Sequence, residues 1–298
     1  MKKFIYACVM LAFSALPSNA KEVKIPFQDL IINANLNMAD GKSIEDGIVL
    51  LVHGNFGHKD MEIMTALQDG LLERGFSSLN INLSYSTDDR HGMFGCENVQ
   101  NRLDADGVEE IGIWTDWLRA QGANRIIFLG HSRGGNHISR YVAETKDPSI
   151  IAAVLVAPPT ADSSNSTENY KVRYDTELVP ILERAVALID AGKGDTPIEG
   201  IGFSFCGETT VTAATFVDNY VEYPDRNTPT VIQRIEIPVL VAVGTDDTVA
   251  TGLAPAMRKI TQDNVTFVEI EDAGHFFLDF FGEDLLDAAE EFIADNGF

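Results

Sequence analysis

The chain has 298 residues, of which 45% are apolar, and its 45 acidic residues outnumber its 22 lysines and arginines to give a net charge of −23. This length suffices for one large α/β domain or two small ones with a substantial core. A surface of this charge repels nucleic acid phosphates and anionic lipid headgroups, so we expect neither a nucleic acid partner nor stable attachment to a membrane surface.

The first 20 residues have the pattern of a secretory signal peptide. Lys2 and Lys3 precede an apolar run over residues 4–16, and Ser18-Asn19-Ala20 is a small-residue cleavage site. The apolar run is shorter than the roughly 20 residues that cross a bilayer. Cys8 lies inside this run rather than just after it, which argues against a lipoprotein. We therefore predict cleavage after Ala20 and export to a bacterial periplasm or the medium.

After this segment, strand and helix patterns alternate along the chain. A hairpin is predicted over 22–38, and short apolar runs predict buried strands. The buried strands are predicted over 48–52, 125–129 and 151–156, and further strands are predicted over 78–83, 238–243 and 265–270. Helical periodicity covers 60–74, 103–120, 134–144 and 250–262, and a last helix has Leu285, Ala289, Phe292 and Ile293 on one face. This alternation predicts an α/β fold with a mostly parallel, doubly wound sheet and right-handed crossovers.

The alternation is interrupted between residues 158 and 233. One amphipathic helix is expected from Leu178 to Ile189, followed by a Gly-rich loop carrying Cys206 and a second helix over 209–220. We interpret 158–233 as an insertion and assign 21–157 and 234–298 to the core.

The sequence Gly130-His131-Ser132-Arg133-Gly134 connects the strand at 125–129 to the helix that follows it. Glycines two residues either side of a serine allow a tight, strained turn that lifts the hydroxyl above the sheet edge. This G-x-S-x-G pattern resembles the nucleophile elbow of the α/β-hydrolase superfamily. The resemblance implies that Ser132 is a catalytic nucleophile, and that the insertion, which follows the next strand, is a helical cap over the active site.

The resemblance also implies a base and an acid that follow Ser132 in the chain, in the order serine, acid, histidine. Four of the six histidines precede Ser132, and His137 is too close on the same helix to reach back, which leaves His275. The family pattern of Gly244, two residues, then aspartate selects Asp247 as the acid. Asp246 and Asp272 remain alternatives.

The pair His53-Gly54 follows an early strand, as in the same family. There this loop supplies one N–H to the oxyanion hole, which implies Asn55 or Phe56 here, and the residue after the nucleophile, Arg133, supplies the other. We interpret His53 itself as structural.

Cys96 and Cys206 remain after removal of the signal peptide, and a pair of cysteines in an oxidising compartment is consistent with a disulfide. Such a bond would connect the cap to the rim of the pocket. No Cys/His spacing predicts a metal site, and no cofactor is expected.

Together these features predict an exported serine hydrolase that cleaves a carboxylic ester of modest size through an acyl-enzyme. A peptidase, thioesterase or acyltransferase could use the same triad on a short acyl or peptidyl substrate. A hydrolase scaffold retained only for binding is the non-enzymatic alternative. The sequence does not specify the oligomeric state.

Overall fold

The structure, a computed structural model, describes residues 20–160 and 167–298. The predicted signal peptide, except for Ala20, lies outside these residues.

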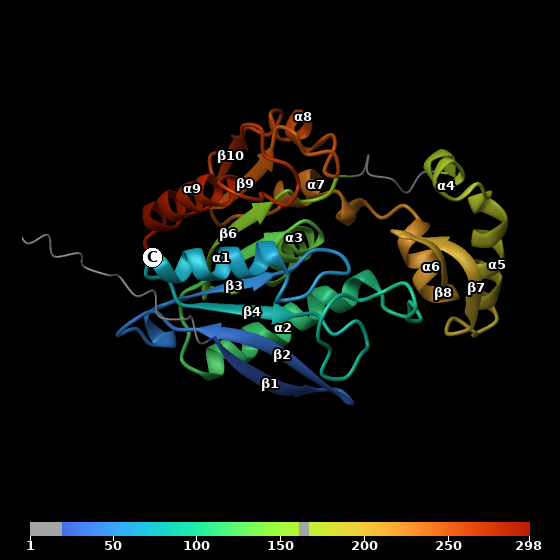
Figure 1. Ribbon diagram of the computed structural model, residues 1–298, viewed down its shortest axis with the longest axis horizontal. Helices are drawn as coiled ribbons and strands as arrows, with labels where there is room; N and C mark the ends of the chain where they lie inside the picture. Colours follow the sequence, from blue (N-terminus) through green and yellow to red (C-terminus); the bar gives the residue numbers. More distant parts are fainter. Residues whose placement is uncertain (1–19, 161–166) are drawn as a thin grey trace, which may run out of the picture.

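The core is an eight-stranded sheet with strand order β1-β2-β4-β3-β5-β6-β9-β10 (Figure 1). The hairpin of β1 and β2 is antiparallel and joins β4 in antiparallel register, and every other neighbouring pair is parallel. The strands are β1 (Lys21–Phe27), β2 (Leu30–Asn37), β3 (Ile48–Val52), β4 (Ser78–Asn82), β5 (Ile126–His131), β6 (Ile150–Val156), β9 (Val239–Gly244) and β10 (Val265–Ile270). All residues of β3, β5 and β9 are buried, as expected for strands covered on both faces. The predicted α/β fold with a mostly parallel sheet is confirmed.

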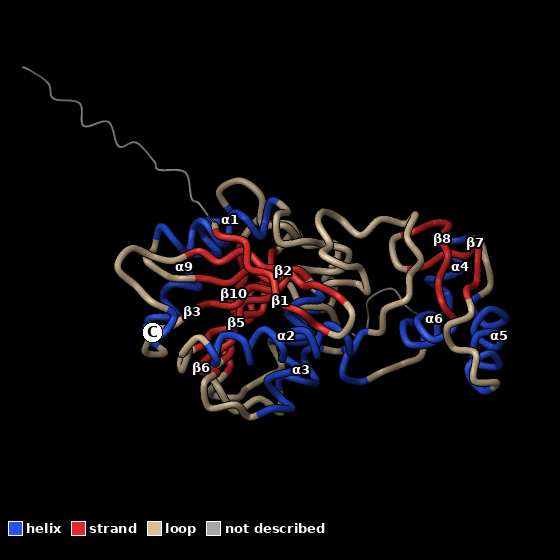
Figure 2. Tube along the Cα trace, turned by 90° about the horizontal axis from the view of Figure 1, so that it is seen from below, coloured by secondary structure: helices blue, strands red, loops and turns tan. Residues whose placement is uncertain are grey.

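Helices cover both faces of this sheet (Figure 2). Helices α1 and α9 lie on one face, where Arg74 at the end of α1 pairs with Glu283, Asp287 and Glu290 of α9. Helices α2 and α3 lie on the other face. Their bounds are α1 (Glu62–Glu73), α2 (Asp104–Ala120), α3 (Arg133–Thr145) and α9 (Phe281–Asp295).

The inserted segment forms a lobe beside the core (Figure 1). It contains α4 (Thr167–Tyr174), α5 (Leu178–Asp190), β7 (Pro197–Phe203), β8 (Cys206–Thr212) and α6 (Ala213–Tyr220). The loop predicted around Cys206 is therefore wrong, because β7 and β8 pair as an antiparallel hairpin. The helix predicted to begin at residue 209 begins at Ala213, where the Thr212 side chain accepts a hydrogen bond from the Thr215 N–H and caps the helix.

Two short helices follow the lobe. Helix α7 (Thr228–Ile232) lies within the predicted insertion but packs on α3 of the core, where Asn136 Nδ2 donates to Thr228 Oγ1 at 3.1 Å. Helix α8 (Leu253–Met257) is much shorter than the helix predicted over 250–262. Across residues 20–160 and 167–298, no helix combines the length and apolar character needed to cross a membrane.

Candidate active site

Ser132 lies at a sharp corner between β5 and α3. Its backbone has φ 52° and ψ −123°, a conformation that non-glycine residues rarely adopt. The Ser132 N–H donates to the Val156 carbonyl of β6 at 2.7 Å, which ties the corner to the neighbouring strand. The side chain is only partly buried, so the corner holds its hydroxyl at the edge where the parallel strands end.

The corner requires glycine at position 134. A Cβ there would lie 2.3 Å from the Val52 carbonyl oxygen and 2.5 Å from that of His53, well inside van der Waals contact. The close approach lets α3 begin directly against the end of β3. As a result, the N-terminus of α3, with its free N–H groups, lies beside Ser132.

His275 and Asp247 are brought together at the same edge. His275 Nδ1 donates to Asp247 Oδ2 at 2.8 Å, and both side chains are almost completely buried. Burial raises the pKa of the Asp247 carboxyl, but the hydrogen bonds that the carboxylate accepts outweigh this effect, so its pKa lies below the ordinary value. Asp247 is therefore ionised, and the His275 ring is held with its Nε2 lone pair available to accept a proton.

The loops that carry these two residues are joined along their main chains. The Asp246 N–H donates to the Ala273 carbonyl at 3.0 Å, and the Asp272 N–H donates to Thr245 Oγ1 at 2.8 Å. Gly244 makes this possible, because a Cβ at that position would lie 2.0 Å from the Ala273 carbonyl oxygen. Asp246 and Asp272 themselves are exposed, so of the three candidate acids it is Asp247 that contacts His275.

His131 connects the elbow to the histidine loop, a contact that sequence reasoning missed. Its ring Nε2 lies 2.9 Å from the His275 carbonyl oxygen, and its ring centroid lies 4.9 Å from that of His275. Burial lowers the pKa of His131 to about 3, with a smaller contribution from His275, so the ring is neutral and the carbonyl contact assigns its proton to Nε2. His131 thus fixes the backbone of His275 relative to the elbow.

Ser132 and His275 both lie at this edge, but no hydrogen bond joins Ser132 Oγ to His275 Nε2 among the residues that the structure describes. In free enzymes such contacts are often long and shorten only when substrate binds.

The loop after β3 contains the residues expected to form an oxyanion hole. The Asn55 and Phe56 N–H groups donate to no other group within the described part of the chain. Phe56 has φ 58°, and its ring packs on Phe94 and Phe205. The Arg133 N–H, the first of α3, has no partner within the helix. His53, by contrast, is fully buried, with Nδ1 bonded to the Gly54 carbonyl and Nε2 accepting from the Leu83 N–H, which agrees with a structural role.

Cys96 and Cys206 form a disulfide, as the sequence suggested. The bond joins the loop before α2 to the first residue of β8 in the lobe. Main-chain bonds reinforce the connection: Gln100 N–H donates to the Thr210 carbonyl at 2.8 Å, and Thr212 N–H donates to the Gln100 carbonyl at 2.9 Å. Asn55 also reaches the lobe, where its Nδ2 donates to Ser204 Oγ at 2.9 Å.

A buried cluster of charges next to the elbow was not predicted. Asp104, at the start of α2, is contacted by His137 and Arg140 of α3 and by Arg226, which follows the lobe. Arg133, His137 and Arg140 are spaced by four and three residues on the helix after the elbow, so the sequence contains a polar stripe that periodicity could have identified.

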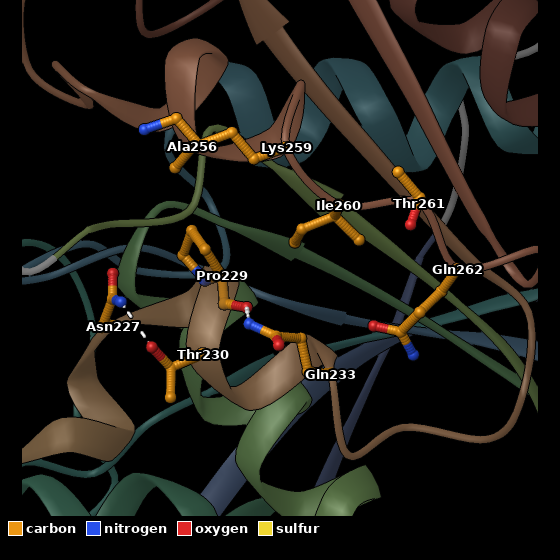
Figure 3. Close-up of a pocket in the computed structure, with 9 residues that line it drawn as sticks. All are labelled: Asn227, Pro229, Thr230, Gln233, Ala256, Lys259, Ile260, Thr261 and Gln262. Carbon is orange, nitrogen blue, oxygen red and sulfur yellow. Dashed lines mark hydrogen bonds between the residues drawn. The ribbon is translucent and has the colours of Figure 1, made fainter.

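A separate cavity of about 340 Å³ lies between α7 and the segment from α8 to residue 262 (Figure 3). None of its nine lining residues is a histidine, a cysteine or a carboxylate. Asn227 Nδ2 donates to Thr230 Oγ1, and Gln233 Nε2 donates to the Pro229 carbonyl. The cavity carries no group for hydrolysis. Over residues 20–160 and 167–298, no cluster of histidine, cysteine and acidic side chains could hold a metal ion.

The strained serine corner and the Asp247–His275 pair lie on a parallel sheet covered by helices, the arrangement of a hydrolase-type α/β protein. The model of the alpha/beta hydrolase family matches residues 49–294, and the chain belongs to this family.

Individual proteins are more distantly similar. A non-heme chloroperoxidase of Streptomyces lividans is 26% identical over 214 residues, which cover 64% of this chain and 74% of that protein. Est1E of Butyrivibrio proteoclasticus, in a structure with ferulic acid bound, has a TM-score of 0.63 at 18% identity, and the match covers 92% of this chain and 98% of that chain. A monoacylglycerol lipase of Paleococcus ferrophilus has a TM-score of 0.61 at 18% identity, and the match covers 89% of this chain and 99% of the lipase.

Proposed function

We propose that this protein is a serine hydrolase that cleaves carboxylic esters of modest size. The observation that carries the proposal is the hydrogen bond of 2.8 Å from His275 Nδ1 to Asp247 Oδ2, made at the sheet edge where the strained Ser132 corner lies. A serine hydroxyl needs such an oriented base to react at neutral pH. The family membership and the presence of a monoacylglycerol lipase among the structural relatives agree with ester hydrolysis.

The proposed reaction has two halves. Ser132 Oγ attacks the ester carbonyl carbon while His275 Nε2 takes the hydroxyl proton, and His275 then gives this proton to the departing alkoxide, leaving an acyl-Ser132. A water molecule next loses a proton to His275 and attacks the acyl carbon. Ser132 leaves as the alkoxide, takes its proton back from His275, and the carboxylic acid is released. The ionised Asp247 stabilises the imidazolium in both halves.

The tetrahedral intermediates carry a negative oxygen, and we propose that the main-chain N–H groups of Arg133 and of Asn55 or Phe56 bind it. Loss of one such donor typically raises a barrier by about 3–4 kcal/mol. The proposal is supported by the position of Arg133 at the free end of α3 and by the unengaged N–H groups after β3.

The decisive experiment combines an active-site label with turnover. We expect a fluorophosphonate probe to label the wild-type protein and 4-nitrophenyl esters of short acids to be hydrolysed, with both activities lost in Ser132→Ala. Aminopeptidase and thioester substrates run in parallel would identify a peptidase or thioesterase. A wild-type protein that neither reacts with the probe nor turns over any of these substrates would favour the binding-scaffold alternative.

A second activity deserves a parallel assay because of the similarity to a non-heme chloroperoxidase. Hydrogen peroxide could replace water as the acceptor of the acyl group, giving a peracid that oxidises halide. Peroxide-dependent halogenation that disappears in Ser132→Ala would support this activity, and halogenation that survives the substitution would exclude Ser132 as its source.

We also propose that the protein is exported, with cleavage after Ala20, to a periplasm or the medium. The disulfide supports this location, because such bonds persist in oxidising compartments. Mass spectrometry of the protein recovered from a bacterial periplasm should give a chain that begins at Lys21. An uncleaved chain in the cytoplasm would contradict the proposal.

A further inference from the structure

A small cavity of about 30 Å³ lies between the elbow and the lobe. Its walls include Asn55 and Arg133 beside the nucleophile, Arg102 and Asp104 before and at the start of α2, and Ser204 and Asp218 from the lobe. A cavity of this size holds about two atoms of water size, since a single water needs at least ~10–15 Å³ by this measure. The cavity is therefore a polar pocket next to the proposed site of ester cleavage.

Positive charge gathers around this pocket. Asp104 lies near three guanidinium groups: Arg140 forms an ion pair with it, and the Nε atoms of Arg226 and Arg133 lie 3.5 and 3.9 Å from its oxygens. Burial raises the pKa of Asp104, but His137, Arg133 and Arg226 together outweigh that effect and hold the pKa well below the ordinary value, so Asp104 is ionised. One carboxylate thus faces three arginines.

The other nearby charges do not cancel this excess. Arg102, a fourth arginine, donates to Asn55 Oδ1 and stacks over the Tyr85 ring. Asp218 pairs with Arg226 at 2.8 Å, and Asp106 is engaged with the Leu103 N–H. Four guanidinium groups therefore meet three carboxylates, in a chain whose net charge is −23.

Several arginine donors in the cluster are buried without a hydrogen-bond partner in the described part of the chain: Nη1 of Arg133, Nη1 of Arg226 and Nε of Arg140. Leaving a buried charged donor unpaired is costly. Burial and the neighbouring arginines both lower the pKa of Arg133, although Asp104 opposes them. Of these three arginines, Arg133 lines the pocket, and an anion bound there would supply an acceptor for its Nη1.

We propose that this pocket binds a carboxylate of the substrate, through the side chains of Arg133 and Arg102. The enzyme would then act on esters that carry a free carboxylate in either the acyl or the alcohol part. A guanidinium group matches the two oxygens of a carboxylate, and the cavity suits this group better than a larger phosphoryl group. This inference rests on the proposed esterase function.

Matched ester pairs test the inference. For the acyl part, 4-nitrophenyl hydrogen glutarate is compared with 4-nitrophenyl pentanoate. For the alcohol part, 4-carboxyphenyl butanoate is compared with 4-carbamoylphenyl butanoate. We expect kcat/KM to favour the anionic member of at least one pair by roughly 10- to 100-fold, the value of a hydrogen bond to a charged group.

Variants of the arginines test whether the pocket causes the preference for the anionic ester. Arg133→Gln keeps the main-chain N–H of residue 133 but removes the guanidinium, and we expect the preference to fall at least tenfold. Arg102→Gln, at a half-buried position, provides a second variant should Arg133→Gln not fold. Arg184→Gln, on the exposed face of α5, is the control, and its preference should equal that of the wild type.

Failure of this inference can be distinguished from failure of the proposed function. A wild type that is labelled by fluorophosphonate and hydrolyses both members of each pair equally would overturn the inference alone. If no ester is hydrolysed, calorimetry of Ser132→Ala with each ester still tests the pocket. Binding of the anionic member that is lost in Ser132→Ala/Arg133→Gln supports it, and equal binding of both members overturns it. Competitive inhibition by inorganic phosphate but not by glutarate would overturn the assignment to a carboxylate.

Discussion

Asp247 accepts three hydrogen bonds, and their arrangement determines how an asparagine at position 247 would affect the His275 ring. Oδ1 accepts from the N–H groups of Val249 and Ala250 at 2.7 and 2.8 Å, and Oδ2 accepts from His275. An asparagine would keep its oxygen on the two N–H groups and turn its NH₂ toward His275 Nδ1. That contact would favour the His275 tautomer protonated on Nε2, which cannot accept the Ser132 proton.

We therefore predict that Asp247→Asn lowers kcat for ester hydrolysis by about 10⁴-fold with little loss of folding stability. Steady-state kinetics with a 4-nitrophenyl ester, together with a thermal melt, provide the measurement. Asp246→Asn is the matched control, because Asp246 is exposed and contributes only its main-chain N–H to the loop pairing. Equal losses in the two variants would mean that Asp247 does not orient the base.

The residues of the site differ in how far the sequence could predict them. Ser132, Asp247 and His275 each follow a parallel strand of the sheet, so their meeting at one edge follows from the parallel topology. The cluster of Asp104 with Arg133, Arg140 and Arg226 depends on the meeting of α2, α3 and the segment after the lobe. No local pattern encodes that meeting. The contact of His131 with the His275 carbonyl was missed for the same reason.

At the scale of elements, the core strands were predictable because burial on both faces demands continuous apolar runs. The hairpin of β7 and β8 was not, because β7 contains Pro197 and two glycines and β8 is mostly polar. Main-chain bonds from Gln100 and the disulfide at Cys206 hold β8 from outside the hairpin, so tertiary contacts rather than strand propensity form these two strands. Helix α8 begins later than predicted because Pro255 cannot donate an N–H to a preceding turn, and it therefore lies in the first turn of the helix.

The disulfide is the element-scale feature with the largest expected energetic effect. It spans 110 residues of sequence, and closing a loop of this length in the unfolded chain corresponds to about 4–5 kcal/mol in the chain-entropy model. We predict that Cys96→Ser/Cys206→Ser loses about 2–5 kcal/mol of unfolding free energy in urea, the range usual for native disulfides. The hydrogen bonds of Gln100 to β8 remain, so ester hydrolysis should persist at low temperature.

Reductant gives the control for this prediction. Dithiothreitol should destabilise the wild type to about the level of the double variant and leave the double variant unchanged. If dithiothreitol leaves the wild type as stable as before, the bond does not contribute as proposed.

For the molecule as a whole, stability should depend on pH through three buried carboxyls. The pKa values of Asp104 and Asp247 lie below their ordinary values, so the stability that these groups contribute is lost as the pH falls through their folded-state pKa values. Glu110 of α2 acts in the opposite direction. Burial raises its pKa from 4.5 to about 7, despite hydrogen bonds from Ser84, so its ionisation destabilises the folded protein as the pH rises between these values.

We predict that Glu110→Gln removes the loss of folding stability that the ionisation of Glu110 causes as the pH rises. A glutamine resembles the protonated acid: its oxygen can accept from the Ser84 N–H, and its NH₂ can donate to the Ser84 hydroxyl. Between pH 5 and pH 8 the wild type should lose up to about 3 kcal/mol more unfolding free energy than the variant. Chemical denaturation at the two pH values measures this difference, and parallel curves for the two proteins would contradict the assignment to Glu110.

The covalent connection of the lobe also limits how the molecule can move. The segment after α6 connects the lobe to the core, and the bond from Cys96 to Cys206 attaches it at a further point. A lobe held at two separate points cannot rotate outward about a single hinge. Admission of a ligand to Ser132 should therefore depend on local rearrangement of side chains and turns, such as the turn carrying Ser204. After a single backbone cut between α5 and β7, the two fragments should stay joined in denaturant until the disulfide is reduced.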